Sequence, residues 1–187
     1  MSSSVPLPSA AAAALPNLLV LGTPGCGKTS LCARLSEVSG LRHIDVGALV
    51  RERSLHSGWD EQHCAFTLDD DKLCDWLEVE LAGGGCCVDF HSTSTFPTRW
   101  FALVVVLRCS TSVLHDRLSA RGYSVSKVAE NMECEIMQVC LDEAREAWDE
   151  RQVVELQSDT IEQLDENVER CKQWLTHWQA QHSAQPA

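Results

Sequence analysis

Short apolar runs alternate with amphipathic stretches along most of this chain. The apolar runs predict buried strands at residues 17–21, 41–45, 86–91, 101–107 and 153–156. Strands that alternate with helices favour a parallel sheet that is covered by helices on both faces. The predicted fold is therefore an α/β domain of three layers with a five-stranded parallel sheet.

Apolar residues at helical spacing fill the stretches between the predicted strands. Helices are predicted at residues 28–39, 46–54, 69–82, 111–121, 126–151 and 161–178. The mixed polarity of Leu55–Phe66 predicts a loop or flap. Residues 1–16 are rich in Ser, Ala and Pro and lack the basic residues of a signal or transit peptide, so we expect a disordered leader. A single domain is predicted over residues 17–182, with a short tail at residues 183–187.

A glycine-rich segment directly follows the first predicted strand. Gly22–Thr29 matches the P-loop pattern G-x-x-x-x-G-K-[ST] at each of its fixed positions. Glycines allow the backbone N–H groups to point at phosphate oxygens, and the following helix adds partial positive charge. We expect Lys28 to reach the β- and γ-phosphates, Thr29 to ligate Mg²⁺ and Ser30 to contact the α-phosphate. The segment predicts a purine nucleotide site at the carboxyl ends of the strands.

Charged residues near the ends of other predicted strands indicate a second layer of chemistry. Phosphoryl transfer depends on charge neutralisation and in-line positioning. Asp89 ends an apolar run, which suits an acid that holds Mg²⁺, although a strand-end Asp can also cap a turn. His91 would lie on the same face as Asp89 if the strand continues, and it either positions water or phosphate or is an ordinary loop residue. The arginines suited to bidentate phosphate contacts are Arg51, Arg108, Arg117 and Arg121.

Charge and cysteine content narrow the classes of partner and site. The formal net charge of −12 disfavours non-specific binding to nucleic acid or anionic membranes and is compatible with a basic protein partner. The ten cysteines include no C-x-x-C pair, so we expect reduced and mostly buried thiols, with Cys86 and Cys87 on opposite strand faces. A zinc site at His56, His63 and Cys64 matches no familiar ligand spacing. No segment is long and apolar enough to span a membrane.

Further short motifs follow the P-loop in a characteristic order. They are V-G-A-L-V-R (Val46–Arg51), V-D-F-H (Val88–His91), F-P-x-R-W (Phe96–Trp100), V-L-R (Val106–Arg108), R-G-Y (Arg121–Tyr123) and N-x-x-C-E-I (Asn131–Ile136). Together with the P-loop, this order resembles the adenylate kinase isoenzyme 6 family over about residues 16–180. Members of that family are small nuclear adenylate kinases that also serve as assembly ATPases of the small ribosomal subunit.

The resemblance implies a P-loop kinase fold and a site for two nucleotides. It implies a short region for the nucleoside monophosphate (NMP) at about residues 45–68, a short lid at about residues 120–130, and Mg²⁺ as cofactor. The reaction would be ATP + AMP = 2 ADP, with accompanying ATPase activity. The residues implied to bind ATP are Gly25, Cys26, Gly27, Lys28, Thr29, Ser30 and Arg121. The resemblance assigns AMP to Gly47, Arg51 and His91, the metal to Thr29 and Asp89, and catalysis to Lys28, Asp89, His91 and Arg121.

The same resemblance implies a partner and a location. A small-subunit ribosomal protein of the uS11 type is the expected partner of a monomer found in nucleus and cytoplasm. The chain also departs from ordinary adenylate kinases: Val46 and Ala48 stand where Thr and Asp are usual, no AMP-clamping arginine follows Asp89, and the lid has one arginine. Because each departure removes a phosphate contact, the alternative function is an ATPase switch that acts on a ribosomal protein and has weak kinase activity.

Overall fold

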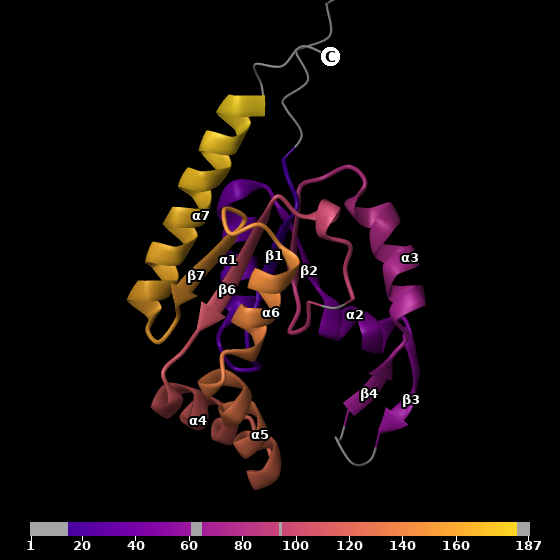
Figure 1. Cartoon of the computed structure of the whole chain (residues 1–187), viewed down its shortest axis with the longest axis vertical. Coiled ribbons are helices and arrows are strands. Elements are labelled where there is room, and N and C mark those ends of the chain that lie inside the picture. Colours follow the sequence, from indigo (N-terminus) through magenta and orange to yellow (C-terminus); the bar gives the residue numbers. More distant parts are fainter. Residues whose placement is uncertain (1–14, 61–64, 94, 183–187) are drawn as a thin grey trace, which may run out of the picture.

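A five-stranded sheet lies at the centre of the protein in the computed structural model, which describes residues 15–60, 65–93 and 95–182 (Figure 1). Its strands are β1 (Leu18–Leu21), β2 (Arg42–Asp45), β5 (Cys86–Asp89), β6 (Leu103–Arg108) and β7 (Val153–Gln157). They are hydrogen-bonded in the order β2-β5-β1-β6-β7, and each neighbouring pair is parallel. The predicted parallel sheet is therefore confirmed.

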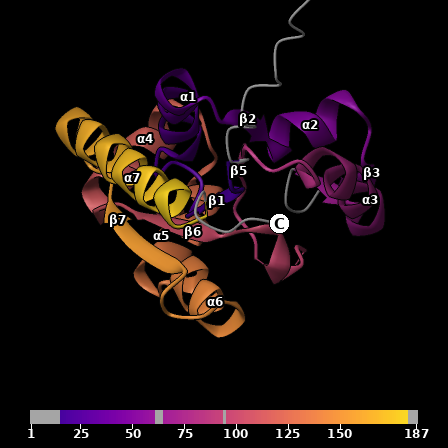
Figure 2. The same cartoon turned by 90° about the horizontal axis from the view of Figure 1, so that it is seen from above.

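Helices cover both faces of this sheet. They are α1 (Lys28–Ser39), α2 (Val46–Glu52), α3 (Asp70–Leu81), α4 (Thr111–Ala120), α5 (Val125–Ile136), α6 (Val139–Ala147) and α7 (Ile161–His182), with a single 3-10 turn at Thr98–Trp100 among the described residues. Buried residues of α2, α3 and α6 form one apolar cluster, and those of α1, α4 and α7 form the other. Figure 2 shows α1 and α7 on one side of the sheet and α6 on the other. The three-layer prediction is confirmed.

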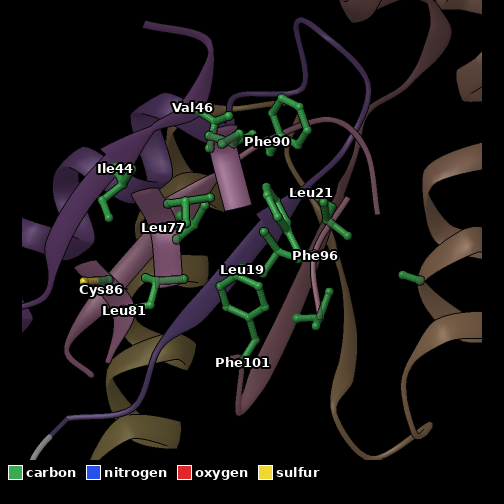
Figure 3. Packing of buried hydrophobic residues seen from close by; sticks show 14 of the residues in the cluster. Leu19, Leu21, Ile44, Val46, Leu77, Leu81, Cys86, Phe90, Phe96 and Phe101 are labelled. Atoms are coloured by element: carbon green, nitrogen blue, oxygen red, sulfur yellow. The ribbon is translucent and has the colours of Figure 1, made fainter. Parts of the chain in front are cut away.

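The central strand β1 explains why the sheet is buried on both faces. Leu19 and Leu21 point into the cluster with α3, whereas Leu18 and Val20 point into the cluster with α1, and all four are fully buried. Figure 3 shows Leu19 and Leu21 in the same cluster as Leu77 of α3. Because burial of one such side chain contributes roughly 1.5–3 kcal/mol, an uninterrupted apolar run is the pattern that this strand requires.

The cysteines of β5 divide between the same two clusters. Cys86 lies in the cluster with α3 and Cys87 in the cluster with α1, so the expectation of opposite faces is confirmed. The Sγ atoms of Cys87 and Cys32 lie 3.1 Å apart as free thiols. Two of the three residues considered for zinc, His63 and Cys64, lie outside the described residues. Across the described ranges no helix combines the length and apolar character needed to cross a membrane.

The prediction of a loop or flap at Leu55–Phe66 is wrong. The strands β3 (His56–Asp60) and β4 (Ala65–Leu68) pair antiparallel and form a two-stranded sheet of their own. Leu55 anchors this hairpin, because its N–H donates to the Val50 carbonyl and its own carbonyl accepts from the Asp69 N–H. Backbone pairing between the two strands stabilises the hairpin, and the local sequence of either strand does not reveal such pairing.

The single long helix predicted at residues 126–151 is also wrong, because the chain breaks it into α5 and α6. Gln138 has a φ of 58°, in the left-handed region. In a continuous helix the Glu135 carbonyl would accept from the Val139 N–H. Here that carbonyl accepts from the Gln138 N–H at 3.2 Å and from Nη2 of Arg108 at 2.9 Å. A tertiary contact with β6 therefore replaces the helical bond and ends α5.

Candidate functional site

The P-loop connects β1 to α1 and bends at its glycines. Gly22, Gly25 and Gly27 have φ values of 142°, 101° and 95°, which favour glycine. A Cβ atom at Gly22 would lie 2.5 Å from the backbone oxygen of Leu107 in β6. One at Gly25 would lie 2.8 Å from Leu114 of α4. The loop therefore needs glycine both for its dihedral angles and for its close contacts with β6 and α4.

A cavity of about 170 Å³ opens above this loop, at the carboxyl ends of β1 and β5. We call it the first cavity. The residues with predicted nucleotide or metal roles that line it are Gly25, Gly27, Lys28, Thr29, Ser30, Gly47, Asp89, His91 and Arg121. They come from the P-loop, α1, α2, the end of β5 and the segment after α4. The fold thus brings together residues that are separated by more than half of the sequence.

Lys28, Thr29 and Asp89 make the closest polar contacts within the first cavity. Nζ of Lys28 donates to the Gly22 carbonyl at 2.8 Å and to the Thr23 carbonyl at 3.3 Å. Oγ1 of Thr29 donates to Oδ2 of Asp89 at 2.6 Å, and Asp89 is 5% exposed. A hydroxyl and a carboxylate this close form a pair of hard oxygen ligands, so these two residues fit a Mg²⁺ ion that also binds phosphate.

His91 follows β5 and reaches both the first cavity and its neighbour. Its ring stacks at a tilt on Phe90, with centroids 4.5 Å apart. The dense surroundings of the ring lower the pKa of His91 below its ordinary value, and the positive charge of Lys28 adds to this effect. The imidazole is therefore neutral at physiological pH, and it can accept as well as donate a hydrogen bond.

A second cavity of about 960 Å³ adjoins the first. Both are lined by Gly47, Phe90 and His91, so the two cavities meet at the end of β5 and the start of α2. Arg51 lines the second cavity and not the first. The second cavity is also lined by residues of α5, including Lys127, and by residues of α6. Figure 1 shows the β3–β4 hairpin and α5 at the same end of the molecule.

The comparisons with known proteins show the family of this chain. An AAA domain family matches residues 18–138. A relative from Schizosaccharomyces pombe, the adenylate kinase isoenzyme 6 homolog, is 46% identical over 90% of this chain and 96% of its own length. The homolog from Saccharomyces cerevisiae, FAP7, is 43% identical over 89% of this chain and 85% of its own length. The chain belongs to the adenylate kinase isoenzyme 6 family. It is thus a P-loop protein of a nucleotide kinase family.

More distant likenesses concern the fold alone. A shikimate kinase from Acinetobacter baumannii superposes with a TM-score of 0.61 at 13% identity, over 87% of this chain and 94% of its own. A shikimate kinase from Bacteroides thetaiotaomicron gives a TM-score of 0.59 at 19% identity, over 87% of this chain and 99% of its own. The predicted P-loop kinase fold is therefore confirmed.

Three residues for which the sequence predicts phosphate or ATP contacts do not line the first cavity, namely Arg108, Arg117 and Cys26. Arg108 lines neither cavity and forms an ion pair with Glu135, with Nε and Oε1 2.6 Å apart. Arg117 donates from Nη1 to the Gly25 carbonyl at 3.3 Å and to the Ser158 carbonyl at 2.8 Å, so it supports the P-loop from below. Cys26 is fully buried and does not line the first cavity.

Sequence reasoning overlooked two acids, one that lines the first cavity and one that contacts the P-loop from outside both cavities. Asp45 lines the first cavity, and its side chain accepts from the Ala48 N–H at 2.8 Å as the N-cap of α2. The cap fixes the start of the helix that carries Gly47 and Arg51. Its signal was an acid at the end of a predicted strand, the same signal that identified Asp89. The other acid, Glu135, is the Glu of the N-x-x-C-E-I motif (Asn131–Ile136), but the motif alone assigned it no role.

Proposed function

We propose that this protein transfers the γ-phosphoryl group of Mg·ATP to AMP, giving two ADP, and that it also hydrolyses ATP slowly. The observation that carries the proposal is the meeting of two cavities at Gly47 and His91, one built on the P-loop and the other containing Arg51. A kinase for two nucleotides needs two adjoining sites with the transferred group between them. In this reading, residues 45–68 form the NMP-binding region and residues 120–130 the lid.

Each residue of the site has a separate task in the proposed reaction. The P-loop amides and Lys28 bind the ATP phosphates, and Arg121 adds positive charge from the lid side. Thr29 and Asp89 hold Mg²⁺, which neutralises phosphate charge when it is bound. Arg51 binds the AMP phosphate. His91 lies where the two cavities meet and, being neutral, donates to a phosphate oxygen without a net charge of its own.

The first experiment measures ADP formation with Mg·ATP, alone and with AMP, dAMP, CMP, UMP or GMP. We expect AMP to stimulate the rate strongly. The Lys28→Ala variant should lose at least about 100-fold of the rate, because one charge contact with the transferred group disappears. If ADP forms slowly and no monophosphate changes the rate, the proposed kinase activity is refuted and ATP hydrolysis remains as the activity.

Arg51→Ala separates the acceptor half of the site from the ATP half. We expect a KM for AMP raised about tenfold or more, since a charge-assisted contact contributes about 1.5–3 kcal/mol, while hydrolysis without AMP survives. Arg53→Ala is the matched control, because Arg53 is exposed, stacks on Trp76 with its Cζ 5.2 Å from the ring centroid, and lines neither cavity. Equal loss of both activities in Arg51→Ala would contradict its role in binding AMP.

A second candidate function is an ATPase switch that acts on a small-subunit ribosomal protein of the uS11 type, in nucleus and cytoplasm. The observation in its favour is the charge of the second cavity, whose described lining holds the acids Asp70, Glu130 and Glu143 against the cations Arg51 and Lys127. Such a surface suits a basic protein more than a phosphate monoester. The candidate predicts that the purified ribosomal protein accelerates ATP hydrolysis several-fold. An unchanged rate at saturating partner would exclude it.

A further inference from the structure

Glu135 is a buried carboxylate outside both cavities. It is 3% exposed and lies at the end of α5. Burial of a charge is costly unless the charge is paired and hydrogen-bonded. Each of its two carboxylate oxygens has its own partners, and these partners come from different parts of the fold.

One oxygen of Glu135 binds the end of β6. Oε1 accepts from Nε of Arg108 at 2.6 Å and from the backbone N–H of Cys109 at 3.1 Å. Arg108 also donates to the Glu135 carbonyl, so one guanidinium binds both the side chain and the helix end. A cation at this place stabilises the last turn of α5. This half of the network fixes α5 to the sheet.

The other oxygen binds the P-loop. Oε2 accepts from Oγ1 of Thr23 at 2.5 Å and lies 3.6 Å from Sγ of Cys26. Thr23 is itself 1% exposed, and its carbonyl accepts from the Cys26 N–H and from Nζ of Lys28. The contacts therefore run from Glu135 through Thr23 to the lysine that lines the first cavity.

The opposite end of α5 belongs to the proposed lid. Ser124 caps the helix and accepts from the Lys127 N–H at 3.3 Å. Nζ of Lys127 lies 5.0 Å from the centroid of the Tyr123 ring. Arg121 of the first cavity precedes Ser124 by three residues. One helix thus connects the lid segment at its start with the P-loop at its end.

We propose that Glu135 is a positioning residue for nucleotide binding. It holds Thr23 and thereby keeps the P-loop in its ATP-binding shape and at a fixed position relative to α5. The inference rests on the proposed ATP site. Glu135 does not touch the nucleotide, and it acts through Thr23.

The two oxygens make Glu135→Gln a selective variant. Its amide oxygen retains the two donors from Arg108 and Cys109, whereas the amide nitrogen replaces the acceptor for Thr23. Thr23→Val removes the same bond from the other side. Asn17→Asp is the matched control: it alters a buried polar group, hydrogen-bonded to backbone, at the opposite end of β1 from the P-loop.

The measurement is the KM for Mg·ATP, kcat and the Tm of each variant. We expect Glu135→Gln to raise KM about tenfold, or about 1.4 kcal/mol, with kcat changed much less. Thr23→Val should act similarly, and the double variant should be no worse than the single variants, because both changes remove one shared contact. Asn17→Asp should lower Tm without changing KM.

Two outcomes would overturn the inference. One is a KM in Glu135→Gln that rises no more than in Asn17→Asp at a similar loss of Tm. The other is a double variant whose effects on KM add fully. If the wild type neither binds nor turns over ATP, the proposed function fails, and hydrogen exchange of the peptide covering residues 18–31 then decides. Faster exchange in Glu135→Gln than in the control Asn17→Asp supports positioning, and exchange in Glu135→Gln that is unchanged from the wild type contradicts it.

Discussion

Two glycine-to-alanine substitutions separate the cost of a left-handed backbone from the cost of a steric clash. Gly22 opens the P-loop with a φ of 142°, and Gly40 ends α1 with a φ of 77°. A Cβ atom at Gly40 would meet none of the described residues within 4 Å beyond its chain neighbours, whereas one at Gly22 would lie 2.5 Å from the Leu107 backbone oxygen. Both variants meet unfavourable dihedral angles, and only Gly22→Ala also meets a neighbouring strand.

The expected destabilisation follows from these surroundings. A left-handed residue with a Cβ costs roughly 1–2 kcal/mol, and this is the whole cost for Gly40→Ala. In Gly22→Ala the clash involves backbone of β6, which is hydrogen-bonded on both sides and cannot turn away as a side chain can. Overpacking of this kind adds about 1–3 kcal/mol. We therefore expect about 1.5 kcal/mol for Gly40→Ala and about 3.5 kcal/mol for Gly22→Ala.

Thermal unfolding and urea titration measure both values. At about 2–4 °C per kcal/mol for a chain of this size, Tm should fall by about 3–6 °C in Gly40→Ala and by about 7–14 °C in Gly22→Ala. Affinity for Mg·ATP should fall only in Gly22→Ala, because Nζ of Lys28 is hydrogen-bonded to the Gly22 carbonyl. Equal losses of Tm in the two variants would refute the steric argument.

Two further predictions concern buried hydrogen bonds and pH. Asn17→Ala should lower the free energy of unfolding in urea by about 2–4 kcal/mol, since it removes the side-chain partner of the Trp100 carbonyl and of the Cys86 N–H, whereas the Leu81 carbonyl keeps the Gly84 N–H; a loss below about 1 kcal/mol would contradict this. The folded state lowers the pKa of His91 below 6.5, so below that pH the unfolded state binds more protons. Stability should rise with pH up to about 6.5 and then level off, with a smaller slope in His91→Gln; an identical slope would contradict this.

The sheet and the P-loop could be predicted because their signals are local. A strand that is buried on both faces needs an unbroken apolar run, as in Val104–Leu107, and such runs are rare elsewhere in the chain. The P-loop pattern fits within the short segment Gly22–Thr29, so its glycines can be recognised there even though their close contacts lie in β6 and α4. Asp89 could be found for a similar reason, because a carboxylate that ends an apolar strand is conspicuous.

The hairpin and the helix break depend on contacts that the local sequence does not show. The hairpin β3–β4 is held by backbone hydrogen bonds between strands and by Leu55, which packs in the cluster with α3. The break between α5 and α6 depends on Arg108. This residue is 27 positions from Glu135 in the sequence and donates a hydrogen bond to the Glu135 carbonyl. The helical spacing of apolar residues continues through the break between α5 and α6. The sequence alone therefore predicts a single helix.

Arg117 and Arg121 show how far pattern reasoning carries at the site itself. They are four residues apart, and at that spacing helical side chains share a face, which favours a joint phosphate clamp. However, Arg121 is the C-cap that follows the last residue of α4, Ala120, and it lines the first cavity. Arg117 stays on the helix beneath the loop and binds the Gly25 carbonyl. Two arginines at the end of one helix thus differ in their surroundings: Arg121 lines the first cavity, and Arg117 contacts the P-loop backbone.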